Sequence, residues 1–372
     1  MSSLLNYIYV GFLSSLALAS PDIPCQDAIK EMPGYVCYKE KKFAEGSYSV
    51  AYLVRKEETD EIFIMKVANI RWQTHNGLNK PDSEFLRLFK GSEYVIQMYE
   101  EKQLGEYLYE ILEYAENGDL QDFVNFNPHF FDDYSEVLKF SLRLVRGLQE
   151  IHKKNVIHTD IKPQNIVVDK EHHPKYIDFN LSLGPHDSKT ANARGDPRYN
   201  PPEVLFNRGK KHTWTADKDV FSLGLVLYYI YNKAMPFASI STNYFERAVK
   251  RKKYLLYKGT PKDYIKIVQG CLQEDPTARY ALPVLEEMIV AAQVAKTPDR
   301  LDRRMLASLD SFELEEAPFV FINPQLLWIF IGIAIGVLSI IAIVLAFVFI
   351  KRRGGAPALH DTPNEFQTDY EY

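Results

Sequence analysis

The feature that most constrains this chain is a polar loop held between two apolar stretches. Val156–Ile157 precedes the loop and Ile166–Val168 follows it. Apolar runs of this length predict short strands that hold an exposed loop between them. The polar residues of the loop have the spacing H-x-D-x-K-x-x-N and are His158, Asp160, Lys162 and Asn165. An ordinary polar loop between strands is the alternative, and four such positions this close together argue against it.

The spacing of this loop resembles the catalytic loop of the eukaryotic protein kinases. The resemblance implies that Asp160 accepts the proton of a substrate hydroxyl, that Lys162 neutralises charge on the transferred phosphoryl group, and that Asn165 holds Mg²⁺. Asp178 stands where the family has the aspartate of its D-F-G motif, and it is expected to be the main Mg²⁺ ligand. Asn180 replaces the glycine of that motif, and asparagine tolerates positive φ better than most residues. ATP and Mg²⁺ are the implied cofactors.

A second group of motifs predicts a nucleotide-binding lobe before the loop. The segment 43–52 resembles the family's phosphate-covering loop, G-x-G-x-x-G-x-V, and retains only its middle glycine, Gly46, between Ala44 and Ala51. Lys66 lies inside an apolar strand, where the family has the lysine that pairs with ATP phosphates. Ile64 is bulkier and Ala51 smaller than the family's residues, so we expect the two to form the roof over adenine, with Val167 as the floor.

The partner of Lys66 and the adenine contacts are expected from the next segments. Asp82–Lys90 has the apolar spacing of a short amphipathic helix. Glu84 is the first candidate to pair with Lys66 and Asp82 is its rival, although a carboxylate early in a helix also simply favours the helix dipole. The link between the lobes is expected over 112–115, with the backbone of Glu113 and Ala115 hydrogen-bonding adenine.

Further motifs follow in the order that the family requires. A long apolar helix is expected over 135–153, and Glu203 and Arg279 are expected to form a buried ion pair. Asp219 is expected to hold the backbone of the catalytic loop. The pair His172–His173, beside a proline between two strands, predicts a hairpin turn rather than a metal site. The resemblance runs from about residue 43 to residue 285 and implies an α+β, two-lobed kinase fold, with a β-rich N-lobe and a helical C-lobe.

Three departures affect the expected activity. Thr159 replaces the arginine that normally pairs with an activation-segment phosphate, so activity is not expected to depend on such a phosphate. Lys162 favours serine or threonine acceptors over tyrosine. Asp196 stands where a threonine is expected after Gly195, and its pairing with Lys162 would disturb acceptor binding. An active Ser/Thr kinase is the first interpretation, and a pseudokinase or a receptor-like membrane scaffold is the alternative.

One apolar segment near the C-terminus predicts a membrane anchor. Leu326–Ile350 is 25 residues long without a charge, which is enough to span a bilayer with some tilt. The basic residues 351–353 follow at once and predict a cytoplasmic tail. Gly332 and Gly336 form a G-x-x-x-G pattern that is typical of a homodimer face, although small residues are common in such helices.

The side of the membrane on which the body lies depends on the N-terminus. Leu4–Ala19 resembles a signal peptide cleaved after Ala19, but no lysine or arginine precedes it. A lumenal or extracellular body is the first interpretation, and a cytosolic body with a tail anchor is the alternative. Cys25 and Cys37 would pair in an oxidising compartment. Asn180 opens the sequon Asn180-Leu-Ser182, where a glycan would collide with the expected Mg²⁺–ATP site.

The expected partners are a protein substrate, ATP and a lipid bilayer. A net charge of −5 spread along the chain gives no reason to expect nucleic-acid binding. The expected organisation is a signal peptide over 1–19, a kinase domain over 38–295, a juxtamembrane linker over 296–325, a transmembrane helix over 326–350 and a tail over 351–372.

Overall fold

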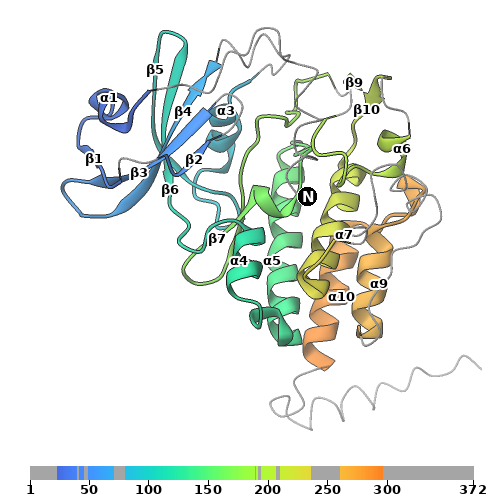
Figure 1. Cartoon of the computed structure of the whole chain (residues 1–372). Coiled ribbons are helices and arrows are strands. Elements are labelled where there is room, and N and C mark those ends of the chain that lie inside the picture. The colour runs from blue at the N-terminus through green and yellow to red at the C-terminus, as the bar shows by residue number, and fades with distance from the viewer. Residues whose placement is uncertain are drawn as a thin grey trace, which may run out of the picture. The chain divides into compact units, whose positions relative to one another are not determined.

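The computed structural model describes residues 23–39, 42–45, 49–70, 80–188, 190–191, 194–206, 210–235 and 260–295. Within these ranges a β-sheet is followed along the chain by a helical region (Figure 1), which confirms the expected α+β fold with two lobes. Several expectations fall outside the described residues: the signal peptide 1–19, Gly46, the linker 296–325, the span Leu326–Ile350 with Gly332 and Gly336, and the tail 351–372.

The N-lobe is built on one antiparallel sheet with the order β1-β3-β4-β6-β5, to which β2 is added beside β3. Side chains alternate between its two faces because successive residues of a strand point to opposite sides. One face packs on the segment that precedes the sheet, α1 (Cys25–Ala28) and η1 (Ile29–Glu31). The strands are β1 (Tyr35–Cys37), β2 (Ala44–Glu45), β3 (Ser49–Lys56), β4 (Ile62–Asn69), β5 (Met98–Leu104) and β6 (Tyr107–Glu113).

A disulfide ties this N-terminal segment to the edge of the sheet. Cys25 in α1 is bonded to Cys37 in β1, with their Cα atoms 6.2 Å apart. Cys271, in contrast, is a buried free cysteine of the helical region. The pairing expected for an oxidising compartment is therefore present in the fold.

A short helix of the described residues lies between the sheet strands and the helical region. α3 (Asp82–Leu86) continues into η2 (Arg87–Phe89), so the expected helical segment is present, with a tighter last turn. Its apolar side chains Phe85 and Phe89 are buried against Phe179. Phe179 belongs to the D-F-N segment, residues 178–180, which stands where the family has D-F-G. This packing brings the first turn of α3 close to the catalytic residues.

The C-lobe is organised around α5 (Tyr134–Lys153), which confirms the long helix expected before the catalytic loop. Asp133 caps it by accepting a hydrogen bond from the Ser135 backbone N–H. α7 (Ala216–Asn232), α9 (Lys262–Cys271) and α10 (Leu282–Ala295) share one buried apolar cluster with it. The smaller elements are α4 (Leu120–Phe126), α6 (Pro202–Leu205), η3 (Phe130–Asp132), η4 (Pro163–Asn165), η5 (Pro276–Ala278), β7 (Ile166–Val168), β8 (Pro174–Tyr176), β9 (Thr190–Ala191) and β10 (His212–Thr213).

The catalytic loop lies between the end of α5 and the hairpin β7–β8. The expected strand Ile166–Val168 is β7, whereas Ile157 forms only an isolated bridge with Leu183. His172 adopts a φ of 62° in the turn between β7 and β8, and its ring contacts Phe123 and Phe130. The hairpin expected at His172–His173 is therefore confirmed.

Among the helices of the described ranges, none combines the length and the apolar character that crossing a bilayer requires.

Candidate active site

Asp219 of α7 fixes the backbone of the catalytic loop. Its two carboxylate oxygens accept hydrogen bonds from the backbone N–H groups of His158, at 2.8 Å, and Thr159, at 2.9 Å. The Nε2 atom of His152, at the end of α5, lies 2.9 Å from the same carboxylate. Asp219 is buried, so these contacts replace water as its partners. The role expected for Asp219 is confirmed.

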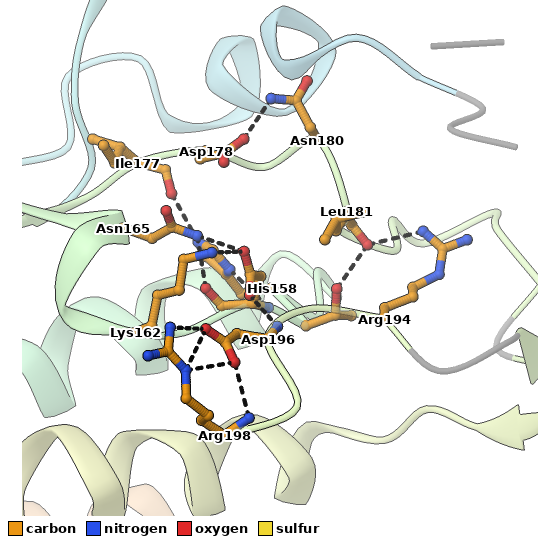
Figure 2. A network of polar contacts seen from close by, with 12 residues as sticks. His158, Lys162, Asn165, Ile177, Asp178, Asn180, Leu181, Arg194, Asp196 and Arg198 are labelled. Carbon is orange, nitrogen blue, oxygen red and sulfur yellow. Dashed lines mark hydrogen bonds and ion pairs between the residues drawn. The ribbon is translucent and has the colours of Figure 1, made fainter. Parts of the chain in front are cut away.

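Three donors hold the carboxylate of Asp160, the proposed base. Lys162 Nζ and Asn165 Nδ2 donate to its Oδ2 at 2.7 and 2.8 Å, and the backbone N–H of Asp196 donates to its Oδ1 at 2.9 Å. Figure 2 shows Lys162, Asn165 and Asp196 converging on one point from the catalytic loop and the activation segment. The sequence spacing therefore places Asp160, Lys162 and Asn165 together as expected.

The activation segment, which follows the D-F-N segment and ends near Glu203, approaches Asp160 through Gly195. Gly195 has a φ of 71°, a conformation that favours glycine. A Cβ atom added there would lie 2.5 Å from the Thr159 carbonyl oxygen and 2.8 Å from Asp160 Oδ1. The close backbone contact with Asp160 thus requires a residue without a side chain.

Asp196 does not take the partner expected from the sequence. Its carboxylate is held by the Arg198 guanidinium, with Nε 3.0 Å from Oδ2 and Nη2 2.5 Å from the same atom. This ion pair lowers the pKa of Asp196 against the opposing effect of burial. Lys162 instead donates to Asp160. The expectation that Asp196 pairs with Lys162 is therefore wrong, because Arg198, two residues away, offers a bidentate partner.

Thr159 and Arg194 meet at one carbonyl oxygen of the activation segment. Thr159 Oγ1 donates to the Leu181 carbonyl oxygen at 2.7 Å, and Arg194 Nη1 donates to the same atom at 3.0 Å. Figure 2 shows the guanidinium group of Arg194 pointing toward the Leu181 carbonyl oxygen, with a dashed line between them. The part of the segment that follows the D-F-N motif is therefore attached to the catalytic loop without a phosphate.

The D-F-N segment carries the expected metal ligand, Asp178. Its φ is 63°, and Asn180 is not among the described residues with positive φ. The Nδ2 atom of Asn180 donates to Asp178 Oδ1. The positive φ expected at Asn180 thus falls on Asp178, so this turn does not need a glycine at its last position. Asn180 is 4% exposed.

Lys66 pairs with Asp82 and not with the first candidate, Glu84. Lys66 Nζ lies 2.7 Å from Asp82 Oδ2, whereas Glu84 is half-exposed and its Oε2 atom lies 3.8 Å from Lys80 Nζ. Side chains two residues apart on a helix point roughly 200° apart, so only one of the two carboxylates can face Lys66. The choice of Glu84 is corrected to Asp82.

Asp82 also links Lys66 to the metal-binding segment. Its second oxygen, Oδ1, accepts a hydrogen bond at 2.7 Å from the backbone N–H of Phe179, the residue after Asp178. Asp82 is buried at the start of α3, where a carboxylate is also favoured by the helix dipole. One carboxylate therefore positions both the lysine and the D-F-N backbone.

The strands place several of the expected nucleotide-contacting residues on one face of the sheet. Ala51 is opposite Lys66 and Ala44 is opposite Ala51 in the strand register, so the three share a face. Ile64 is on this face too, and both Ile64 and Val167 of β7 pack against the large apolar cluster. The roof and floor over adenine stay a prediction.

The link between the lobes follows β6. Glu113 is the last residue of that strand and forms an ion pair with Lys175 of β8. Ala115 is buried just beyond it. The Asn117 backbone N–H donates to the Val168 carbonyl oxygen at 3.1 Å. The link is thus held against the hairpin that carries Val167.

The side-chain oxygen atoms of Asn165 and Asp178 are suitable ligands for a hard cation. Asn165 uses its amide nitrogen to bind Asp160, which leaves its amide oxygen as the atom with ligand chemistry. Asp178 supplies a carboxylate, and carboxylate and amide oxygens are the ligands that Mg²⁺ prefers. Within the described ranges, no group of three or more His, Cys, Asp or Glu side chains is arranged so that it could hold a metal ion. A bound Mg²⁺ would therefore rely on Asn165, Asp178 and phosphate oxygens.

A buried ion pair stabilises the end of the activation segment. Arg279 donates from Nη1 and Nη2 to the two carboxylate oxygens of Glu203, at 2.9 and 2.8 Å. The side chain of Arg279 is 1% exposed, so the bidentate geometry compensates for lost hydration. The pair expected from the sequence is confirmed.

No role is predicted from the sequence for Arg198 or Glu110, which are both charged side chains at this site. Arg198 binds Asp196, and Glu110 of β6 lies 3.8 Å from Lys66 Nζ. The signal for Glu110 was available, since it is a carboxylate inside the apolar strand Tyr107–Glu113. Only the pairing register of β4 and β6 shows that it faces Lys66.

Comparison with known proteins decides the family. The family model described as "Protein kinase domain" matches residues 38–293, more than half of the chain. The chain belongs to the protein kinase family. Kinases of this family use ATP with a divalent metal ion and phosphorylate proteins.

Several curated kinases are similar to this one at low identity. "Serine/threonine-protein kinase AtPK1/AtPK6" of Arabidopsis thaliana is 28% identical over 243 residues, which cover 64% of this chain and 50% of the relative. "Citron Rho-interacting kinase" of Homo sapiens is 28% identical over 240 residues, with coverages of 61% and 12%. "Ovarian-specific serine/threonine-protein kinase Lok" of Drosophila melanogaster is 24% identical over 299 residues, with coverages of 76% and 62%. The chain thus spans less than two thirds of the length of each of these relatives.

Proposed function

We propose that this kinase transfers the γ-phosphoryl group of ATP to serine or threonine hydroxyls of proteins. The observation that carries the proposal is the set of donors around Asp160, which orients a carboxylate where an acceptor hydroxyl would bind. The Lys66–Asp82 pair adds a positioned cation for the phosphates of a nucleotide. These two features support the proposal of a phosphoryl-transfer site built from one chain.

The roles of the residues follow from this arrangement. Asp160 would accept the proton of the hydroxyl as the hydroxyl oxygen attacks phosphorus. Lys162, 2.7 Å from Asp160, would place its ammonium group beside the same oxygen and offset charge on the transferred group. Lys66 would bind the non-transferred phosphates. Mg²⁺ bound by Asn165 and Asp178 would supply further charge neutralisation to the phosphate oxygens.

The preference for serine and threonine is supported by Lys162 and by the Arg198–Asp196 pair. Because Arg198 engages the Asp196 carboxylate, the ammonium group of Lys162 is directed to Asp160 and not to Asp196. The acceptor side of the site thus keeps the lysine that suits an aliphatic hydroxyl. Two of the three similar kinases reported above are named serine/threonine-protein kinases.

Phosphate transfer from labelled ATP to dephosphorylated casein tests the proposal. The full chain is expected to incorporate label into phosphoserine and phosphothreonine, and an Asp178→Ala variant is expected to lose this activity. Label found in phosphotyrosine would contradict the acceptor preference. Incorporation no greater than that of the variant would favour the alternative, a pseudokinase or receptor-like scaffold that binds nucleotide or partners without catalysis.

We further propose that the kinase is anchored in a membrane through Leu326–Ile350, with its body in the lumen or outside the cell. The Cys25–Cys37 disulfide supports this side, because disulfides persist in oxidising compartments and are rare in the cytosol. The buried side chain of Asn180, bonded to Asp178, supports a folded body in which the sequon is shielded. A tail-anchored kinase with a cytosolic body is the alternative.

Protease protection in sealed microsomes distinguishes the two orientations. A body protected until detergent is added, with a tail that is cleaved at once, is the expected result. A body digested without detergent would show that it faces the cytosol and would contradict the proposed orientation.

A further inference from the structure

Glu110 lies on the face of the sheet that carries Lys66. The two residues are directly opposite in the antiparallel pairing of β4 with β6, so their side chains share that face. Lys66 Nζ lies 3.8 Å from Glu110 Oε2 and 2.7 Å from Asp82 Oδ2. One lysine therefore stands between two carboxylates from different elements.

The two carboxylates are not equivalent. Asp82 is hydrogen-bonded through both of its oxygens, to Lys66 and to the Phe179 backbone N–H. Glu110 is 0% exposed, and neither of its carboxylate oxygens has a hydrogen-bond donor among the described residues. An ionised carboxylate without donors is costly to bury, whereas its neutral form is much less so.

The charges around Glu110 come from four elements. Burial raises the pKa of the Glu110 carboxyl to about 7, Lys66 of β4 lowers it, and Asp82 of α3 raises it. Glu101 of β5 adds a further increase and Arg87 of η2 a further decrease. The attraction of Lys66 thus only partly offsets the effect of burial.

We propose that Glu110 is a positioning residue that takes up a proton when nucleotide binds, so that an ionised Glu110 no longer competes with the phosphates for Lys66. The proposal rests on the proposed function, because it requires the phosphates to bind at Lys66. The proton passes from solvent to a carboxylate oxygen of Glu110, and no bond of the nucleotide changes. Nucleotide affinity then falls as the pH rises.

The physical reason is the balance of charge around Lys66. Without nucleotide, one ammonium group faces Asp82 and a partly ionised Glu110. The phosphates bring further negative charge to the same ammonium group, which makes an ionised Glu110 less favourable. Binding of phosphate and binding of a proton therefore favour each other, and this coupling must be reciprocal.

Isothermal titration of the full chain with Mg²⁺ and the non-hydrolysable analogue AMP-PNP measures this coupling. Titrations at pH 7 in two buffers of different ionisation enthalpy give the number of protons taken up. The matched variants are Glu110→Gln, which cannot titrate, and Glu93→Gln, which removes a carboxylate from the surface. Proton exchange by the nucleotide itself is common to all three proteins and cancels in the differences.

The expected result is that the wild type and Glu93→Gln take up about half a proton more than Glu110→Gln, because a group with a pKa of about 7 is half ionised at pH 7. Between pH 6 and pH 8, Kd for the wild type is expected to weaken by up to about tenfold relative to that of Glu110→Gln. Equal proton counts in all three proteins, with nucleotide bound, would overturn the role of Glu110 alone. A wild type that binds no nucleotide at either pH would overturn the proposed function and this inference with it.

Discussion

At the scale of single residues, the charge around Lys66 determines how the nucleotide half of the site works. A lysine inside a β-sheet needs compensating groups, and the structure supplies Asp82 at hydrogen-bond distance and Glu110 at a longer one. Asp82 also holds the backbone of Phe179, so removing its charge affects two parts of the site. Glu84 carries the same charge two residues away but faces Lys80.

Asp82→Asn and Glu84→Gln form a matched pair for this difference. Asp82→Asn is expected to lower kcat/KM for ATP by about 10²-fold, because a misplaced cation stabilises the transferred charge poorly. Glu84→Gln is expected to stay within about twofold of the wild type, since an exposed charge contributes little. Steady-state kinetics with varied ATP measure both, and equal losses in the two variants would contradict the assignment.

Glu110 is also expected to make the stability of the kinase depend on pH. Its pKa in the folded protein is about 7, above the ordinary value of 4.5. The folded state therefore binds more protons than the unfolded state between these values, and the stabilisation present below pH 4.5 is lost as the pH rises through 7. Relative to Glu110→Gln, the wild type is expected to lose about 2.5 kcal/mol of unfolding free energy between pH 5 and pH 8. Urea unfolding at both pH values measures it, and a constant difference would contradict the buried, titrating carboxyl.

At the scale of elements, two segments outside the sheet and helices are held by specific contacts. The segment before the sheet is bonded to β1 through Cys25 and Cys37 and covers one apolar face of the N-lobe. The activation segment is held to the catalytic loop by Thr159, which donates to the Leu181 carbonyl oxygen, and Arg194 of the same segment also donates to that atom.

Loss of the disulfide is expected to destabilise the body. The bond joins two residues with a sequence separation of 12. Closing a loop of this size stabilises the folded protein by about 3 kcal/mol, because it restricts the unfolded chain. A Cys25→Ser, Cys37→Ser double variant is expected to melt on the order of 5–10 °C lower than the wild type. A reducing agent should lower the melting temperature of the wild type and leave that of the variant unchanged. Equal sensitivity of the two proteins would contradict the bond.

The activation segment is expected to be ordered without phosphorylation. Because Thr159 Oγ1 and Arg194 already hold the Leu181 carbonyl oxygen, no phosphate is needed to attach the segment there. Phosphatase treatment is expected to leave phosphate transfer within about twofold of the untreated level. An Arg194→Gln variant should lose activity in both states. Activity abolished by the phosphatase alone would show that a phosphate supplies the missing contact.

At the scale of the whole molecule, the features predictable from sequence are those marked by family motifs. The loop from His158 to Asn165 and the ion pair Glu203–Arg279 belong to motifs with fixed partners, so the sequence places them correctly. The partner of Lys66 depends on which way the first turn of α3 faces, and this orientation is set by tertiary packing of Phe85 and Phe89. The sequence marks Glu110 as a carboxylate in an apolar strand, but only the pairing of β4 with β6 shows that it faces Lys66.

The most direct test compares phosphate transfer and nucleotide binding in a variant of Asp160, the proposed base. Asp160→Asn removes the proton acceptor and keeps the shape of a side chain held by Asn165 and the Asp196 backbone. The account predicts AMP-PNP affinity within about threefold of the wild type, together with a loss of phosphate transfer to casein of at least about 10²-fold. A wild-type chain that binds the nucleotide but transfers no more phosphate than Asp160→Asn would contradict catalysis at this loop.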